Sequence, residues 1–154
     1  SGKSQLALAL LRTAGSGALS FARLVSDDRC HLEAHHGRLV VLSPAGIAGL
    51  IEVRGLGIRH LPFEPIAVVG LVVDLAAADA ERLPAAASRQ TTIEGIRLPR
   101  LAVAPRADPL PQVLAALFTV PAPDTTIAVR TGAVEKINHG GHTFDTPTGA
   151  AGEP

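Results

Sequence analysis

Three residues near the beginning of the chain, Gly2, Lys3 and Ser4, stand directly before a run rich in Ala and Leu. Gly-Lys-Ser at the beginning of a helix is typical of the last part of a phosphate-binding loop, where backbone N–H groups and the helix dipole hold phosphate oxygens. Lys3 would reach the outer phosphates, and the Ser4 hydroxyl would bind Mg²⁺, which prefers oxygen ligands. Together with Ser1, these are the candidate nucleotide-binding residues. The alternative is a Gly-Lys-Ser that begins a helix by chance.

Two adjacent carboxylates, Asp27 and Asp28, follow a short apolar stretch through Leu24 and Val25. At the end of a strand such a pair could hold a metal ion. One of the two could also accept the proton of a hydroxyl that attacks a phosphoryl group. The alternative is an acidic turn in solvent, because unpaired Asp is usually exposed.

Glu52 and Arg54 flank Val53, so on a strand both side chains would point to one face. Gly55 and Gly57 follow, and they free the backbone for close approach to a ligand or a partner. The functional interpretation is a carboxylate for a metal ion and a guanidinium for phosphate, with Gly55 beside them. The alternative is a simple ion pair between Glu52 and Arg54.

The apolar pattern predicts the elements that would position these residues. A helix that begins near Ser4 has apolar residues on every face, so we expect it to be buried and to end around residues 15–17. Residues 24–26 are expected to form a strand that carries Asp27 and Asp28 at its carboxyl end. Residues 29–43 are expected to form a hairpin that turns at Gly37.

Farther along the chain, strand and helix signals alternate. Residues 66–75 are apolar on both faces and predict a buried strand, followed by a short helix over 76–83. Residues 97–103, which include Pro99, predict an edge strand, and residues 110–118 predict a helix opened by two prolines. Residues 121–123 resemble a linker, 125–129 predict one more strand, and the Gly, Thr and Pro that dominate from 138 onward predict a mobile tail. The order is mixed α and β.

Composition excludes several classes of protein. A chain of 154 residues with 47% hydrophobic content can bury one core, so a single domain is the default. Fourteen Lys and Arg balance fourteen Asp and Glu, and only 3% of residues are aromatic, which argues against nucleic acid and an anionic membrane as partners. The single Cys30 cannot form an internal disulfide, and no signal-peptide pattern is visible. We therefore expect a cytoplasmic protein.

Two of these motifs resemble a known family. Residues 51–58 are similar to the I-E-I-R-G-L-G-I signature of the HPr kinase/phosphorylase family, and residues 24–28 resemble its L-V-A-D-D. The 24 residues from Asp28 to Glu52 match the spacing expected in that family. With Gly-Lys-Ser, three motifs stand in the right order. The resemblance covers roughly residues 1–105 and is close to short forms that lack a separate amino-terminal domain.

The resemblance implies an α/β fold, a P-loop kinase-like domain of the HPr kinase/phosphoenolpyruvate carboxykinase type with a mixed sheet. Residues 1–120 would be the kinase catalytic domain, and 121–154 a linker, a strand and a flexible tail. The implied function is that of a protein-serine kinase, which uses ATP and Mg²⁺ to phosphorylate a serine on the phosphocarrier protein HPr of the phosphotransferase system. A homo-oligomer, specifically a hexamer, is also implied.

Roles carry over residue by residue. Lys3 resembles the lysine of the phosphate loop, and Ser4 and Glu52 resemble the magnesium ligands. Asp28 corresponds to the base of the forward reaction and the acid of the reverse one, with Asp27 as its supporting neighbour. Residues 81–84 are similar to the family's D-R-L-G, which implies that Arg82 is the catalytic arginine. The alternative for Arg82 is a surface charge on a short helix.

The sequence also departs from the family. More residues than expected lie between Lys3 and Asp28, and the V-R-P-G-R-N segment associated with the phosphorylase direction corresponds only to residues 104–108. The front of the phosphate loop and an upstream histidine are missing. Either the chain is a fragment, or residues 152–154 complete the loop and His139 replaces the histidine. The alternative function is a nucleotide-binding regulatory or interaction domain without turnover.

Overall fold

The fold is seen in a computed structural model of the chain, and the structure describes residues 2–121. The chain divides into two units, Ser1–Val120 and Pro121–Pro154, of which the first is described below. The strand expected at 125–129 and the tail from 138 lie outside the described residues. The elements are α1 (Lys3–Gly15), β1 (His31–His35), β2 (Arg38–Leu42), η1 (Ala45–Ile47), β3 (Leu50–Val53), β4 (Gly57–His60), β5 (Ile66–Val68), β6 (Val72–Leu75), η2 (Ala87–Arg89), β7 (Gln90–Ile93), β8 (Ile96–Val103) and α2 (Leu110–Phe118).

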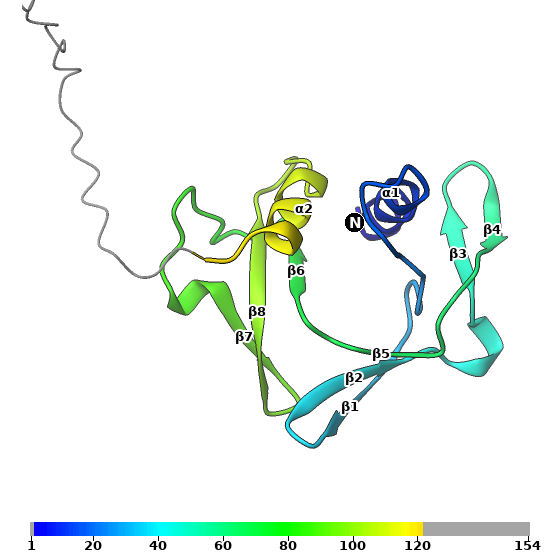
Figure 1. The fold of residues 1–154 in the computed structure, drawn as a ribbon, viewed down its shortest axis with the longest axis horizontal. Coiled ribbons are helices and arrows are strands. Elements are labelled where there is room, and N and C mark those ends of the chain that lie inside the picture. The colour runs from blue at the N-terminus through cyan, green and yellow to red at the C-terminus, as the bar shows by residue number, and fades with distance from the viewer. Residues whose placement is uncertain (1, 122–154) are drawn as a thin grey trace, which may run out of the picture. The chain divides into compact units, whose positions relative to one another are not determined.

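Three small sheets make up the β structure of this unit (Figure 1). The first has the antiparallel order β1-β2-β5, and the second is the antiparallel hairpin β3-β4. The third has the order β6-β8-β7, in which β6 runs parallel and β7 antiparallel to β8. The α/β class and the mixed sheet expected from the sequence are therefore confirmed.

The predicted hairpin over 29–43 is confirmed as β1 and β2. His36 and Gly37 form its two-residue loop, and both have positive φ, 47° and 76°. Loops with two positive φ angles match the right-handed twist of the flanking strands, so Gly37 fixes the register. That register pairs Leu32 with Val41 and His35 with Arg38.

The single buried strand predicted over 66–75 is wrong. The segment forms two strands in different sheets, β5 beside β2 and β6 beside β8, and none of its residues is buried. Val69 still donates its backbone N–H to Leu39 O at 2.8 Å, and the chain then leaves that sheet at Gly70. A glycine inside an apolar run marks such a change of direction.

The short helix predicted over 76–83 is also wrong. Ala76 has a φ of 62°, which a right-handed helix does not allow, and the following residues form turns and bends. Ala77 is buried and donates its N–H to Val103 O at 2.9 Å. Tertiary bonds therefore hold an extended loop where the alanine content alone favours a helix.

The strand predicted over 97–103 exists as β8, but it lies at the centre of its sheet and not at an edge. The prediction rested on Pro99, which has no N–H to donate. Residues 96–99 of β8 pair with β7, and residues 100–103 pair with β6. Pro99 thus stands where one pairing ends and the other begins, the place at which a missing N–H matters least.

The bounds of both helices agree with the sequence. α1 ends at Gly15, as predicted, and α2 begins behind Pro109 with a proline in its first turn. α1 contacts β3 and α2, yet none of its residues is buried, so the expectation of a buried helix is wrong. Its Leu and Ala residues are half-covered because these two elements reach only part of its surface. Within residues 2–121 no helix is long and apolar enough to cross a membrane.

Gly49, the residue directly before β3, lies in a tightly packed place. Gly49 has a φ of 73°, and a Cβ there would lie 2.8 Å from both Leu61 O and Phe63 Cδ1 and 2.9 Å from His60 Nε2. Leu61 donates its N–H to Gly49 O at 2.8 Å, so the backbone cannot easily move away.

We expect Gly49→Ala to lower the free energy of unfolding by about 2 to 4 kcal/mol, the sum of left-handed strain and overpacking. Chemical denaturation measures this loss. The matched control is Gly37→Ala, which has a similar φ of 76° but nothing within 4 Å of the added Cβ. It should show only the strain, about 1 to 2 kcal/mol. Equal losses in the two variants would contradict the packing argument.

Candidate functional site

The amino-terminal end of α1 has no side-chain cap among residues 2–121. Gly2 is the N-cap residue, and the first turn holds no acidic residue. Leu6 donates its N–H to Gly2 O at 3.0 Å, which continues the helix from its first residue. A helix end of this kind suits an anion because its first N–H groups and its dipole both favour negative charge.

Asp27 connects this helix end to β3. The Ser4 hydroxyl donates to Asp27 Oδ1 at 2.7 Å, and the backbone N–H of Glu52 donates to Asp27 Oδ2 at 3.1 Å. One carboxylate therefore holds two segments that lie 23 and 25 residues away along the chain. The structure brings Ser4, Asp27 and Glu52 together, as the motifs imply.

The segment that carries Asp27 is not a strand, contrary to the prediction for 24–26. Leu24 makes one isolated parallel bridge to Phe63 and accepts the N–H of Glu64 at 2.8 Å. Its side chain is buried, at 5% exposure. A single buried leucine with two backbone contacts thus anchors the acidic pair, without a strand.

Lys3 and Asp28 also belong to this group. Lys3 Nζ lies 3.2 Å from Asp28 Oδ1, and the two side chains are 54% and 65% exposed. Exposed ion pairs contribute only about 0 to 1 kcal/mol, so this contact adds little to the stability of the fold. Asp28 itself remains open to solvent, where a second substrate can approach it.

Arg54 and Gly55 lie in the turn between β3 and β4 and not on a strand, because β3 ends at Val53. Leu56 donates its N–H to Val53 O at 2.9 Å, and Gly55 has a φ of 81°. Glu52 and Arg54 therefore do not share a strand face, and no ion pair joins them in the described part of the chain. Arg54 is exposed at the tip of the hairpin.

Arg82 is not on a helix, because 76–83 form a loop. It lies in an exposed bend. Between residues 2 and 121, no hydrogen bond or ion pair joins its side chain to Lys3, Ser4, Asp27 or Asp28. Direct contacts therefore join five of the candidate residues, Glu52 through its backbone N–H, and do not include Arg82.

The donor atoms suit a magnesium ion that arrives with a nucleotide. Among residues 2–121 no three His, Cys, Asp or Glu side chains gather in a way that could hold a metal by themselves. Mg²⁺ commonly takes one or two carboxylates together with substrate phosphates and waters. The Ser4 hydroxyl and the Asp27 carboxylate, in direct contact, are oxygen donors of this kind.

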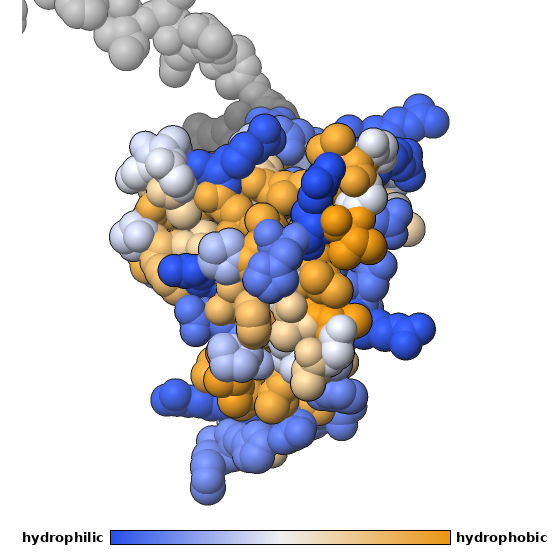
Figure 2. All heavy atoms as spheres, turned by 90° about the vertical axis from the view of Figure 1, so that its right-hand side faces the viewer, coloured by the Kyte–Doolittle hydropathy of each residue, from blue (hydrophilic) through white to orange (hydrophobic). Residues whose placement is uncertain are grey.

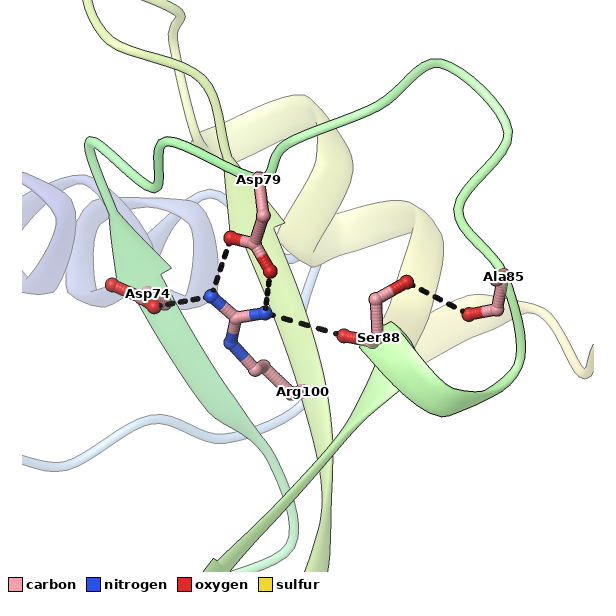
Figure 3. Close-up of polar contacts among 5 residues, drawn as sticks. All are labelled: Asp74, Asp79, Ala85, Ser88 and Arg100. Atoms are coloured by element: carbon pink, nitrogen blue, oxygen red, sulfur yellow. Dashed lines mark hydrogen bonds and ion pairs between the residues drawn. The ribbon is translucent and has the colours of Figure 1, made fainter.

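A second polar cluster centres on Arg100 of β8 (Figure 3). Its Nη1 and Nη2 donate to the two carboxylate oxygens of Asp79 at 2.7 and 2.9 Å, and Nη2 also donates to Asp74 Oδ2 at 2.5 Å. Nη1 lies 3.3 Å from Ser88 O. The Arg100 side chain is only 15% exposed. This cluster was not predicted from the sequence. A signal for it is weak: Arg100 lies two positions from Leu98, which is buried, and a charged side chain on the buried face of a strand needs a partner.

This cluster shifts the ionisation of its members. The hydrogen bond from Arg100 lowers the pKa of Asp79 below its ordinary value. The carboxylates of Asp79 and then of Asp74 raise the pKa of Arg100, which stays charged at any working pH. Because the folded-state pKa of Asp79 is depressed, its bond contributes stability above the unfolded value of about 3.9. That contribution is lost as the pH falls through the folded value.

We expect the difference in unfolding free energy between the wild type and Asp79→Asn to be constant from about pH 7 to pH 5 and to shrink below about pH 4. Chemical denaturation at a series of pH values measures it. A difference that stays unchanged to the lowest pH at which the domain folds would show that the Asp79 charge does not stabilise the fold.

Comparison with known proteins gives a match in structure but not in sequence. No protein-family model matches the chain, and no curated protein matches it. Among solved structures, the HPr(Ser) kinase/phosphatase from Coxiella burnetii matches with a TM-score of 0.58 and 24% sequence identity. The match covers 75% of this chain and 77% of that one. The chain has the fold of this HPr(Ser) kinase/phosphatase. The family resemblance seen in the motifs is thus supported by the fold.

Proposed function

We propose that this chain is a protein-serine kinase of the HPr type, which transfers the terminal phosphoryl group of ATP to a serine of an HPr-like phosphocarrier. The observation that carries the proposal is the group formed by Lys3, Ser4, Asp27, Asp28 and the Glu52 amide at the amino-terminal end of α1. It occurs in a chain with the fold of an HPr(Ser) kinase/phosphatase. ATP and Mg²⁺ are the proposed nucleotide and metal.

Each residue has a part in this transfer. The first turn of α1 and the Lys3 ammonium hold phosphate oxygens, and Ser4 with Asp27 supplies oxygen ligands to the magnesium ion that neutralises charge on the phosphates. Asp28 accepts the proton of the serine hydroxyl as its oxygen bonds to phosphorus. The bond from phosphorus to the bridging oxygen breaks, and ADP leaves with the electron pair. In the reverse direction Asp28 would donate the proton.

The remaining candidate residues complete the proposed site. Glu52 is a second carboxylate for the metal ion, and Arg54 with Gly55 at the hairpin tip would contact phosphate or the partner. Arg82 would stabilise charge on the transferring group, which requires its loop to lie against the bound nucleotide. These roles rest on the motif resemblance together with the placement of Glu52 beside Asp27.

A homo-oligomer, with a hexamer as the specific expectation, is part of the proposal. Figure 2 shows apolar side chains between charged ones on the side of the unit where β3 and β4 lie. Leu56 and Ile58 of this hairpin are each 62% exposed. Exposed apolar side chains that form a contiguous patch favour contact with another protein surface. Light scattering on the purified chain measures the oligomeric state.

Incubation of the chain with labelled ATP, Mg²⁺ and HPr tests the proposal directly. Label on a serine of HPr is the expected result. ATP binding by calorimetry without any label on HPr would contradict the kinase assignment and support the regulatory domain without turnover.

A further inference from the structure

The loop that carries Arg82 is bonded to the sheet near its first end. It runs from Ala76, directly after β6, to the beginning of η2 at Ala87. At the first end, Ala77 is buried and bonded through its N–H to Val103 O of β8. At the other end the contacts are local: the N–H and the hydroxyl of Ser88, in η2, both donate to Ala85 O, at 3.1 and 2.9 Å.

A single guanidinium joins these two ends. Arg100 binds both carboxylate oxygens of Asp79 in the first part of the loop and approaches Ser88 O in η2, directly after the loop (Figure 3). Residues 80–87, which lie between Asp79 and Ser88, include Arg82. Within the described part of the chain, no hydrogen bond or ion pair joins the side chains of these residues to a strand. Because the Asp79 contact is bidentate, it fixes the orientation of the loop as well as its position.

The same guanidinium is attached to the strand that leads to the nucleotide site. Asp74 lies on β6, diagonal to Arg100, since Val72 pairs with Arg100 and Asp74 with Ala102. The next residue, Leu75, lies against the amino-terminal end of α1, because a Cβ on Gly2 would be 3.9 Å from Leu75 Cδ1. Through β6 the Arg100 cluster therefore connects the Arg82 loop to the proposed phosphate-binding residues.

We propose that Arg100 is a positioning residue, which acts through Asp79 and Asp74 to hold the Arg82 loop where its guanidinium can meet the transferring phosphoryl group. This inference rests on the proposed kinase function and names a residue that the motifs do not include. Arg100 does not touch the nucleotide. Arg100 affects kcat only because it positions the Arg82 side chain.

Limited proteolysis tests the attachment of the loop without any catalytic readout. In Arg100→Met, trypsin should cut the Arg82–Leu83 bond about tenfold faster than in the wild type, because cleavage follows the population of the open loop. The matched control is Arg97→Met on the same strand, whose exposed side chain has no hydrogen bond or ion pair within residues 2–121. Arg100→Lys should be cut at an intermediate rate, because a single ammonium cannot bind both oxygens of Asp79.

A double-mutant cycle in the kinase assay tests the catalytic consequence. Arg100→Met should lower kcat by about 10- to 100-fold with little change in the KM for ATP, as expected for a misplaced catalytic group. Arg82→Ala should have a similar effect, and the double variant should lose little more than Arg82→Ala alone, because Arg100 acts through Arg82. Asp79→Asn, which leaves Arg100 paired with Asp74, should repeat the loss in a milder form if Arg100→Met is poorly folded.

The outcomes separate the two proposals. A wild-type chain that transfers no phosphoryl group contradicts the kinase function, regardless of the cleavage rates that trypsin gives. An active wild type whose single losses multiply in the double variant contradicts the positioning role of Arg100. Equal cleavage rates in Arg100→Met and Arg97→Met would contradict the attachment of the loop itself.

Discussion

Asp28→Asn is expected to lower the rate of phosphoryl transfer by about 10²- to 10⁴-fold, the usual contribution of a general base. ATP binding should stay nearly intact, because a base is needed only when the acceptor hydroxyl loses its proton. The structure favours this separation. Asp28 is 65% exposed and its ion pair within residues 2–121 is to the exposed Lys3, so the substitution should lower the free energy of unfolding only slightly.

Single-turnover kinetics with HPr and calorimetry with ATP measure the two effects separately. Asp108→Asn is the matched control, since an asparagine can still accept the Leu110 N–H that Asp108 Oδ1 accepts at 3.1 Å. It should change neither quantity. Full transfer activity in Asp28→Asn would show that this carboxylate is not the base.

Local signals in the sequence predicted local structure well. α2 was predicted with its bounds, because two prolines mark its beginning and its apolar face is periodic. The β1–β2 hairpin was predicted from the glycine at its turn. The hairpin between β7 and β8 was not predicted, although Glu94 and Gly95 also have positive φ. Glu-Gly is a weaker signal for this turn than Asn-Gly or Asp-Gly.

The errors occur where tertiary contacts override local preference. Residues 66–75 were predicted to form one strand, because a pattern of apolar residues does not show where a chain passes from one sheet to another. Residues 76–83 were predicted to form a helix because alanine favours one. The hydrogen bonds of Ala77 to Val103 and of Arg100 to Asp79 stabilise a non-helical loop there. Pro99 indicated an edge strand because nothing local shows that β8 exchanges partners at that residue.

The candidate site could be predicted only in part for the same reason. Short motifs singled out Lys3, Ser4, Asp27, Asp28 and Glu52, and contacts in the structure join these residues, Glu52 through its backbone N–H. The Arg100 cluster consists of single residues 21 and 26 positions apart, with no motif around them. Sequence spacing of that length predicts no contact unless the strand pairing is already known. The parallel pairing of β6 with β8 is such a long-range feature.

Asp27→Ala is expected to weaken magnesium-dependent ATP binding by about 10- to 100-fold, the cost of losing a group that orients or supplies a metal ligand. The Ser4 hydroxyl would lose its acceptor, and the Glu52 N–H would lose the contact that holds β3 to the helix end. The first of these hydrogen bonds is part-buried and the second is exposed, so we expect a loss in unfolding free energy of only about 1 to 2 kcal/mol. The substitution should therefore affect magnesium-dependent ATP binding much more than the free energy of unfolding.

Titration of the chain with ATP, in the presence and absence of Mg²⁺, measures this effect. Glu52→Gln is the informative comparison, because it keeps the backbone N–H that Asp27 accepts and removes only the carboxylate charge. If Glu52 is a ligand, its variant should also weaken the magnesium dependence while leaving unfolding unchanged, since a neutral amide is a poorer partner for a hard cation. If Asp27→Ala binds Mg²⁺ and ATP as the wild type does, Asp27 only ties α1 to β3. The metal must then depend on other oxygens.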